Sequence, residues 1–337
     1  MAKRKIIMDV DTGTDDAVAL VLAILGGEVE LLGVTTVNGN LELKLTTDNT
    51  LRVVECCRSY GLVPVYSGCE YPLVSTLSPY SAQSLSPIPK REGTVKEFAM
   101  HRDHLPLPET TLKKQDKSAA VWLIETVMAS EPGSISLVAL APLTNIAAAM
   151  RAEPAFAGRL GEIVLMGGGD RIGNASAAAE FNIWTDPEAA EIVMQSGCKI
   201  SMIPLDATHS AAITAEQAVA LRAIGTPQAE FVANVIFERI GGYALRDPAL
   251  AKQQASPLHD ALALCYLLHP ECITQKHELV CHVDVSGGVA YGRTVVDRRE
   301  NLVTEQPNCV FAEKADAAYF YDWIYSILKN AAARVRS

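Results

Sequence analysis

Short apolar runs alternate with amphipathic segments over roughly the first two hundred residues of the chain. The apolar runs predict strands at residues 5–11, 29–37, 63–66, 135–140, 162–166 and 199–205. Helices are predicted between them, at residues 15–25, 42–60, 119–129 and 144–150 and from residue 187 onward. Because these strands are apolar throughout, we expect a mainly parallel sheet that is covered by helices on both faces.

The remaining segments have different patterns. Residues 75–117 are rich in proline and serine with little periodicity, which favours an irregular loop or a lid. From residue 213 the pattern is mostly helical, with a small hairpin near residues 280–296 and a closing helix at 315–334. We find no internal repeat and no linker, so residues 1–337 are predicted to form a single α/β domain with a mainly parallel central sheet.

Four carboxylates follow the first predicted strand. Asp9 and Asp11 end the apolar run, and Asp15 and Asp16 open the next helix, with a glycine between the pairs. Aspartate at the start of a helix is a common cap, which explains at most the second pair. Like charges this close repel one another, and a cluster of oxygen ligands suits a hard divalent cation such as Ca²⁺ or Mg²⁺. We therefore predict a metal site at this bend.

Further polar residues follow other predicted strands. In parallel sheets, ligands bind beyond the carboxyl ends of the strands, and those ends share one rim. Residues at or just past these ends include Asp9, Asp11, Asn38, Asn40, Leu140, Met166 and Asp206. The sequence therefore predicts that the functional site lies at this rim.

The composition narrows the possible partners. The chain has 337 residues, 49% of them hydrophobic and 20% charged, and a formal net charge of −10, which argues against nucleic acid as a partner. No stretch approaches the roughly 18 uninterrupted apolar residues of a membrane span. The N-terminus does not resemble a secretory leader, and the eight cysteines follow no zinc-binding spacing. These features favour free thiols and a cytoplasmic location.

Two clusters in the middle of the chain contain polar residues. The glycines of Gly167-Gly168-Gly169-Asp170 do not fit GxGxxG, so dinucleotide binding is poorly supported. Asp186 before Pro187 is typical of a helix cap, which is a structural role. Glu180 and Asn182 are expected to lie in an extended segment and to point the same way. An acid beside an amide suits sugar hydroxyls, which both donate and accept hydrogen bonds.

A histidine next to an aspartate opens a late apolar helix at residues 261–268. A lone histidine is more often structural than catalytic. The pair His259-Asp260 nevertheless makes His259 a candidate general acid, because a carboxylate adjoins it at a helix start. The other histidines considered have no such neighbour and are interpreted as structural or surface residues: His209, His269, His277 and His282.

Taken together, these motifs resemble the nucleoside hydrolase family, the inosine–uridine-preferring ribohydrolases, from about residue 3 to residue 323. The resemblance depends on motifs that occur in the family's order: the aspartates of Asp9–Asp16, Gly39-Asn40, Leu143-Thr144-Asn145, Met166-Gly167-Gly168, Asn174, Glu180-Phe181-Asn182, Asp186-Pro187-Glu188 and His259-Asp260-Ala261. It implies a Rossmann-like core and calcium-dependent hydrolysis of the N-glycosidic bond of ribonucleosides, to give free base and ribose. It also implies a homodimer or homotetramer.

The resemblance also implies a role for particular residues. Ca²⁺ would be bound by Asp11, Asp16, Asp260 and the backbone carbonyl of Leu140, and Asp11 would take a proton from the attacking water. The ribose hydroxyls would be held by Asp15 and Asn40 (2′), Asn182 (3′), and Asn174 and Glu180 (5′). His259 would protonate the leaving base, with Tyr243 as a relay or stacking partner, and Phe181 and Met166 would offer apolar surface.

This sequence departs from the family pattern at two places. Relatives usually carry an HGxxGLG-like stretch on a mobile loop, whereas residues 100–108 lack those glycines, and His101 is the remaining candidate for a role at the base. Thr12 stands where a proline is common, a change that leaves the carboxylates in place. The preferred base is left open by the sequence.

Two alternatives explain part of the sequence. A haloacid-dehalogenase-like phosphatase also begins with an apolar strand and DxD, but Gly13 replaces its usual threonine or valine, and the late His259-Asp260 has no role in it. A catalytically inactive relative that binds calcium or a ribonucleoside is the other alternative.

Overall fold

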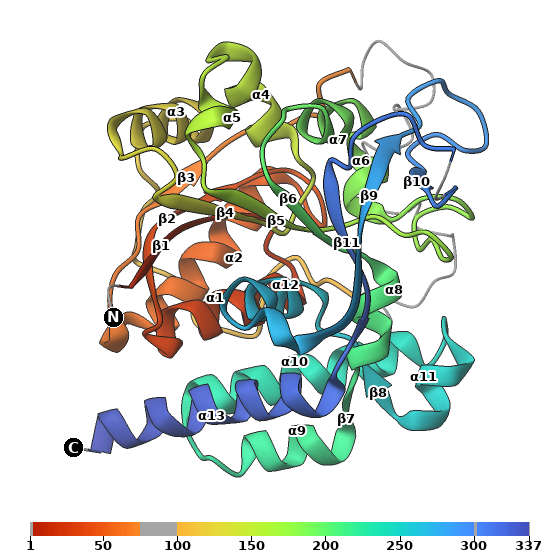
Figure 1. The fold of residues 1–337 in the computed structure, drawn as a ribbon. Helices are drawn as coiled ribbons and strands as arrows, with labels where there is room; N and C mark the ends of the chain where they lie inside the picture. The colour runs from red at the N-terminus through yellow and green to blue at the C-terminus, as the bar shows by residue number, and fades with distance from the viewer. Residues whose placement is uncertain (1–2, 75–99, 300–301, 337) are drawn as a thin grey trace.

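A nine-stranded sheet forms the centre of the described part of the chain, which in this computed structural model comprises residues 3–74, 100–299 and 302–336. The strand order is β10-β9-β11-β6-β5-β4-β1-β2-β3 (Figure 1). Its strands are β1 Arg4–Val10, β2 Val29–Thr36, β3 Val65–Ser67, β4 Ile135–Ala139, β5 Glu162–Met166, β6 Ile200–Ile203, β9 Ile273–Val283, β10 Thr294–Asp297 and β11 Cys309–Ala315. Two short strands, β7 Ile213–Thr214 and β8 Ala255–Ser256, pair separately.

The sheet is parallel over most of its width. β1 pairs in parallel with β2 and β4, and parallel pairing continues through β5 and β6 to β11. Among the strands described, β9 runs opposite to the rest of this sheet and pairs antiparallel with both β11 and β10. The predicted fold class, α/β with a mainly parallel central sheet, is confirmed.

Helices cover both faces of the sheet. In Figure 1, α3, α4, α5 and α7 lie above the sheet, whereas α1, α2 and α12 lie below it, with α9, α10 and α13 as a further layer. The helix bounds are α1 Thr14–Gly26, α2 Leu43–Cys56, α3 Ala119–Ala129, α4 Thr144–Ala152, α5 Phe156–Arg159, α6 Phe181–Thr185, α7 Pro187–Met194, α8 Leu205–Thr208, α9 Ala215–Arg222, α10 Pro227–Tyr243, α11 Pro248–Gln253, α12 His259–Leu268 and α13 Ala317–Arg336. None of the helices in the described ranges has the length and apolar character to cross a membrane.

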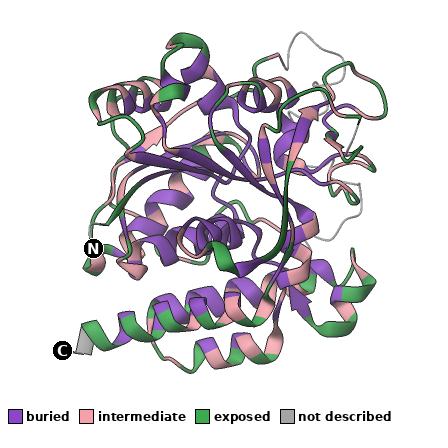
Figure 2. Ribbon diagram, in the orientation of Figure 1, coloured by how far each residue is buried: buried purple, intermediate pink, exposed green. Residues whose placement is uncertain are grey.

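The alternation of side chains along β1 explains why both layers form. Ile6, Met8 and Val10 point into the core shared with α1, α12 and α13, whereas Ile7 points into the core on the opposite face. All four are fully buried, and the central strands are buried along their length (Figure 2). Burial of each such side chain contributes about 1.5–3 kcal/mol, so a strand without a polar face is stable only between two layers.

The late part of the chain contains a strand that the sequence pattern did not reveal. The predicted hairpin is present as β9 and β10, with Thr294 opposite Val283. β11 then inserts between β9 and β6, and the closing helix begins at Ala317 instead of residue 315. The first part of the predicted lid, residues 75–99, lies outside the described residues, and residues 100–117 are irregular.

Candidate active site

The site begins at the bend between β1 and α1. β1 ends at Val10 and α1 begins at Thr14. The Asp16 carboxylate accepts hydrogen bonds from the backbone N–H groups of Asp11 at 3.2 Å and Gly13 at 3.1 Å. Asp16 therefore also closes the start of α1, so the capping interpretation is correct for this residue.

Glycine is required at two positions around this bend. A side chain at Gly13 would overlap the ring of His101, and one at Gly39 would overlap the carboxylate of Asp11. The chain therefore passes close to both functional groups only because neither residue has a Cβ atom.

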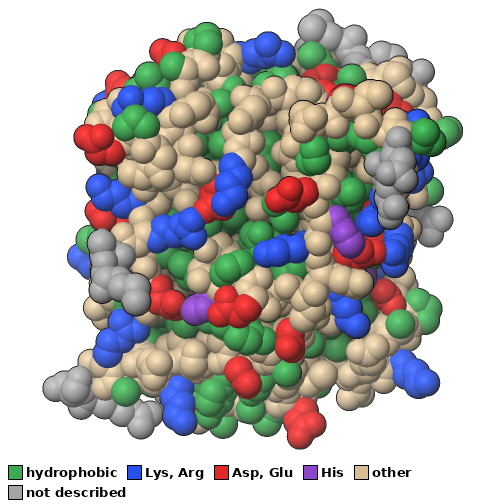
Figure 3. Space-filling view, viewed as in Figure 1, with side chains coloured by type: hydrophobic (Ala, Val, Ile, Leu, Met, Phe, Trp, Pro, Cys, Tyr) green, Lys and Arg blue, Asp and Glu red, His purple; other side chains and the backbone are tan. Residues whose placement is uncertain are grey.

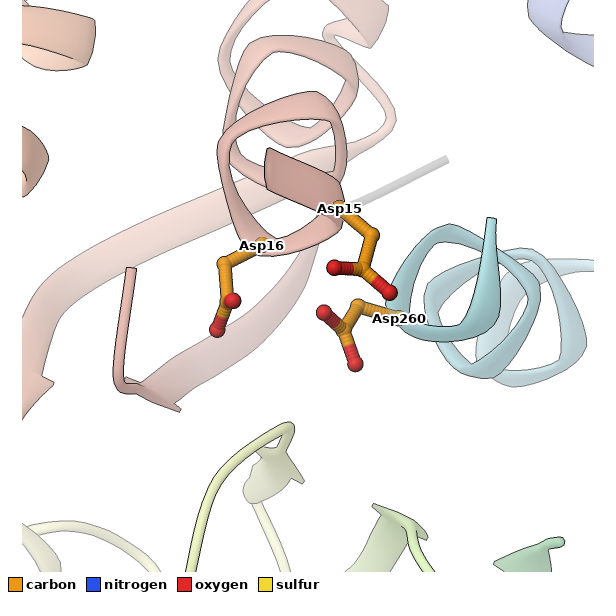
Figure 4. Close-up of side chains that lie close together, drawn as sticks. All are labelled: Asp15, Asp16 and Asp260. Carbon is orange, nitrogen blue, oxygen red and sulfur yellow. The ribbon is translucent and has the colours of Figure 1, made fainter. Parts of the chain in front are cut away.

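Three carboxylates converge beyond the bend. Asp15 and Asp16 extend from the first turn of α1, and Asp260 from the first turn of α12. The carboxylates of Asp15 and Asp260 face each other, and that of Asp16 lies beside them (Figure 4). One oxygen of each lies within 4.8 Å of the others, and all three residues are buried. Burial, followed by repulsion from Asp15, raises the pKa of Asp16 to about 7. Burial and the charges of Asp15, Asp16 and Asp11 raise the pKa of Asp260 well above its usual value.

Asn40 connects Asp11 to this group. Its backbone N–H and its side-chain amide donate to the two oxygens of Asp11 at 2.6 and 3.0 Å, and the same amide lies 3.3 Å from an Asp16 oxygen. Burial and the charge of Asp16 raise the pKa of Asp11 well above its usual value. The structure thus brings together Asp11, Asp15, Asp16, Asn40 and Asp260, which the sequence had placed in three separate segments.

Arg239, on α10, contacts this group of carboxylates, and the sequence did not reveal it. Its side chain is 1% exposed, and Nη1 donates to an oxygen of Asp15 and to the hydroxyl of Thr14, both at 2.8 Å. Within the described residues, Arg239 is the cation paired with this group of carboxylates. Nothing in the pattern of α10 marks it, because its partners lie 224 and 225 residues away.

Asp9, on β1 just before the bend, makes hydrogen bonds that connect β1 to neighbouring segments. One of its oxygens accepts hydrogen bonds from Thr35 and, at 2.8 Å, from the amide of Asn145. Burial raises the pKa of Asp9 to about 7 although both hydrogen bonds lower it. Its backbone carbonyl accepts the N–H of Leu140 at 2.8 Å, which fixes the end of β4 beside the end of β1.

The backbone around Glu180 and Asn182 corrects the sequence prediction. The segment is not extended, because Glu180 is the N-cap of α6 and accepts the N–H groups of Asn182 and Ile183. Glu180 also accepts the N–H of Gly168 at 2.9 Å. Glycine at position 168, with a φ of 77°, allows this close turn after β5. Burial raises the pKa of Glu180 to about 7.

Asn182 links the ends of two strands. Its side-chain amide donates to the backbone carbonyls of Leu140 and Met166, both at 3.0 Å, so both of its N–H groups are used. Its Oδ1 is the atom suited to accept a hydrogen bond from a hydroxyl group. Nearby, exposed Asn174 accepts the N–H of half-buried Phe181 at 2.8 Å.

His259 belongs to a connected chain of polar groups. Its Nε2 lies 2.6 Å from the Tyr243 hydroxyl and its Nδ1 lies 2.7 Å from the Thr208 hydroxyl. Burial and the charge of Arg239 lower the pKa of His259 well below its usual value, and burial raises the pKa of Tyr243 to about 12. The ring of His209 lies 5.7 Å from that of His259, so this histidine, interpreted from the sequence as a structural or surface residue, is a neighbour of His259.

His101 lies directly against the bend. Its Nδ1 accepts the backbone N–H of Thr14 at 3.3 Å. Burial lowers the pKa of His101 to about 4, so the ring is neutral at pH 7. The segment around residue 101 therefore reaches the site although the usual glycines are absent.

These residues fit a hard divalent cation. Three buried carboxylates with oxygens within 4.8 Å of one another are compensated by one guanidinium, so an added positive charge would stabilise their ionised forms. The carboxylates in this group offer oxygen ligands, as Ca²⁺ and Mg²⁺ prefer.

The surface visible in Figure 3 has both acidic and basic side chains.

The fold and the site define an α/β enzyme with an acidic centre that could hold a metal ion at the carboxyl rim of a parallel sheet. The family described as inosine-uridine preferring nucleoside hydrolase matches residues 6–322. The chain therefore belongs to this family of ribonucleoside hydrolases, whose members are metal-dependent. The resemblance to the nucleoside hydrolase family, which the sequence motifs indicated, is therefore confirmed.

Individual relatives agree with this assignment. The chain is 38% identical to the inosine-uridine preferring nucleoside hydrolase of Leishmania major over 296 residues, 88% of each chain. It is also 38% identical to the pyrimidine-specific ribonucleoside hydrolase RihB of Escherichia coli strain SE11, over 298 residues and 88% of each chain. A solved purine-preferring ribonucleoside hydrolase from Gardnerella vaginalis is 29% identical, with a TM-score of 0.84 over 98% of this chain and 99% of its own.

Proposed function

We propose that this protein binds Ca²⁺ and hydrolyses the N-glycosidic bond of ribonucleosides, releasing the base and ribose. One observation carries the proposal: the acidic bend at residues 11–16 and the distant Asp260 meet at the carboxyl rim of the sheet. Family membership supports the reaction type. It also argues against the phosphatase alternative, because the family match at residues 6–322 includes both the aspartates of residues 9–16 and the pair His259-Asp260.

Asp11, Asp16, Asp260 and the carbonyl of Leu140 are the proposed ligands. The crowding of buried carboxylates supports the assignment for Asp16 and Asp260, and the Asn40 amide that contacts both Asp11 and Asp16 supports it for Asp11. Leu140 has a fixed position, and its carbonyl accepts one of the Asn182 N–H groups. When bound, the ion supplies positive charge that holds the carboxylates ionised and lowers the pKa of a neighbouring water. Asp11 then takes a proton from the water as it attacks the anomeric carbon.

The ribose would lie over the carboxylates. Cleavage of an N-glycosidic bond builds positive charge on the sugar, and buried carboxylates stabilise that charge as it develops. Asp15 and Asn40 would hold the 2′-hydroxyl, and Asn182 the 3′-hydroxyl through Oδ1. Glu180 and Asn174 would hold the 5′-hydroxyl.

The base would leave toward His259. The hydrogen bond between His259 and Tyr243 supports a proton relay that ends on the departing base. His101 would contact the base from the side of the bend, and Phe181 and Met166 would offer apolar surface. Asp9, which contacts Thr35 and Asn145, would hold the bend in place.

The test is incubation of the protein with a panel of purine and pyrimidine ribonucleosides, with and without a chelator, followed by detection of free base. Base release that stops with the chelator supports the proposal. Tight ribonucleoside binding without release would instead identify the inactive alternative.

Assembly and location belong to the same proposal. We expect a homodimer or homotetramer, which light scattering of the purified protein would show, and a cytoplasmic location. The relatives are named for different bases, inosine and uridine, pyrimidines or purines, so family membership leaves the preferred base open.

A further inference from the structure

The guanidinium of Arg239 has one nitrogen that the protein does not use. Nε donates to the Pro257 carbonyl at 3.1 Å, and the two N–H groups of Nη1 serve Asp15 and Thr14. Nη2 is buried and has no hydrogen-bond partner among the described residues. Of the five N–H groups of arginine, two are therefore unused, and both are on the same atom.

An unpartnered N–H pair on a buried charge requires an explanation. Buried polar groups in proteins almost always have a partner, and a charged group without one destabilises the fold. The Arg239 side chain is 1% exposed, so bulk water does not supply that partner. The pairing with Asp15 already explains why the charge is present, but it does not explain the orientation of Nη2.

The position of the guanidinium points to a ligand at the base end of the site. It lies between the bend, which it contacts through Asp15, and the segment before α12, which it contacts through Pro257. It also stands 5.7 Å from the centre of the Tyr243 ring, and the Tyr243 hydroxyl contacts His259. The ribose-side residues Glu180 and Asn182 make other contacts, with the ends of β4 and β5.

We propose that Arg239 donates its Nη2 N–H pair to a carbonyl oxygen of the nucleobase and stabilises the negative charge on the departing base. The proposal rests on the hydrolase function proposed above and adds a substrate class, namely ribonucleosides whose base carries a carbonyl oxygen at C6 of a purine or at C4 of a pyrimidine. Arginine suits this role because a guanidinium stays charged at all working pH values and pairs well with base oxygens.

Cleavage of the N-glycosidic bond explains why a positive charge near the base, such as that of Arg239, would accelerate the reaction. When the bond between C1′ and the base nitrogen breaks, its electron pair stays on the base, and conjugation places part of the negative charge on the carbonyl oxygen. The oxygen of water forms the new bond to C1′, one water proton goes to Asp11, and the base receives a proton from the His259 side. Arg239 exchanges no proton and stabilises only the charge, most strongly in the transition state.

The test combines a change in the protein with a change in the substrate. Arg239→Lys keeps a positive charge within reach of Asp15 but cannot place two N–H groups at the position of Nη2. It is compared with wild type on two substrate pairs: inosine with purine riboside, and uridine with pyrimidin-2-one riboside, where the second member lacks one base oxygen. The ratio of kcat/KM within a pair cancels any general loss of activity in the variant.

We expect wild type to favour the oxygen-bearing member of at least one pair, and Arg239→Lys to reduce that ratio by about tenfold to a hundredfold. The matched control is Arg222→Lys on α9, whose exposed guanidinium contacts Asn234, and it should keep the wild-type ratio. Unchanged ratios in Arg239→Lys for both pairs, or wild-type ratios near one for both, would overturn the proposal. If wild type releases no base from any ribonucleoside, the hydrolase function itself fails instead.

Discussion

Buried charge is what the residues of this site share. Asp11, Asp16 and Asp260 lie within the protein, and their pKa values are raised by burial first and by neighbouring aspartates second. Each of these carboxylates would be more stable in water, so their burial together has a cost in folding free energy. Among the described residues, Arg239 is the cation paired with this group of aspartates, and its single charge reduces this cost without balancing it.

Replacement of Asp11 tests the assigned base. We expect Asp11→Ala to lower kcat by several orders of magnitude, because a metal ligand and the proton acceptor are lost together. The measurement is release of free base at saturating nucleoside. Asp322→Ala, which removes an exposed carboxylate on α13, should retain wild-type activity. Activity in Asp11→Ala within about tenfold of wild type would contradict the role of Asp11.

Glu180 should make stability depend on pH. Burial raises its pKa from 4.5 in the unfolded chain to about 7 in the folded protein, so the folded state binds the proton more tightly. The Glu180 contribution to stability is therefore lost as the pH rises from about 4.5 to 7, by up to about 3 kcal/mol. Urea unfolding with chelator at pH 5 and pH 8 should show a smaller loss for Glu180→Gln than for wild type. Glu131→Gln, at an exposed position, should follow wild type, and parallel behaviour of all three proteins would refute the assignment.

Residues of the site that belong to short sequence motifs could be predicted from the sequence. The bend from Asp9 to Asp16 and the pair His259-Asp260 are local patterns, and each has its own chemical signature. Arg239 and Thr208 have none, since their functional contacts are with residues far along the chain. Asn182 was found as a residue, but its helical backbone was missed because α6 has only five residues.

At the scale of elements, two helices begin with the same Asp-Pro pair in different surroundings. Asp186 caps α7 at the Ala189 N–H, and it also accepts the Thr144 hydroxyl and the Leu73 N–H. Asp247 caps α11 through the N–H groups of Ala249 and Leu250 and is partly exposed. The first aspartate therefore joins three segments, and the second stabilises one short helix.

These two caps should differ in their energetic effect. We expect Asp186→Ala to lower the free energy of unfolding by about 2–4 kcal/mol, because buried donors lose their acceptor. Asp247→Ala should cost about 1 kcal/mol, the usual value for a helix cap. Chemical denaturation of both variants measures the difference. Equal losses would show that burial at Asp186 adds nothing to its role as a cap.

Most of β9 and all of β11 were missed by the sequence pattern, and both strands have exposed residues. The central strands β1, β4 and β5 read as continuous apolar runs because both of their faces are covered. β9 has five consecutive exposed residues, and β11 contains Glu313 and Lys314 among its apolar residues. A mixed pattern of this kind is not distinguished from a loop or a short helix by periodicity alone.

For the whole molecule, the topology explains why two distant segments form one site. Successive parallel strands return their carboxyl ends to the same rim, which places the bend after β1 beside the end of β4. α12 then packs along α1, so that Asp260 meets Asp15 and Asp16 although about 245 residues separate them. The rim was predictable from the strand pattern, whereas the packing of α12 on α1 was indicated only by the family resemblance.

Calcium titration of chelator-treated protein tests the central claim most directly, with heat of binding and release of free base followed in the same samples. We predict one bound ion per chain, activity that rises in proportion to occupancy, and loss of both in Asp260→Asn. Full activity in the chelator-treated protein, or calcium binding that leaves base release unchanged, would contradict a catalytic metal centre at this bend.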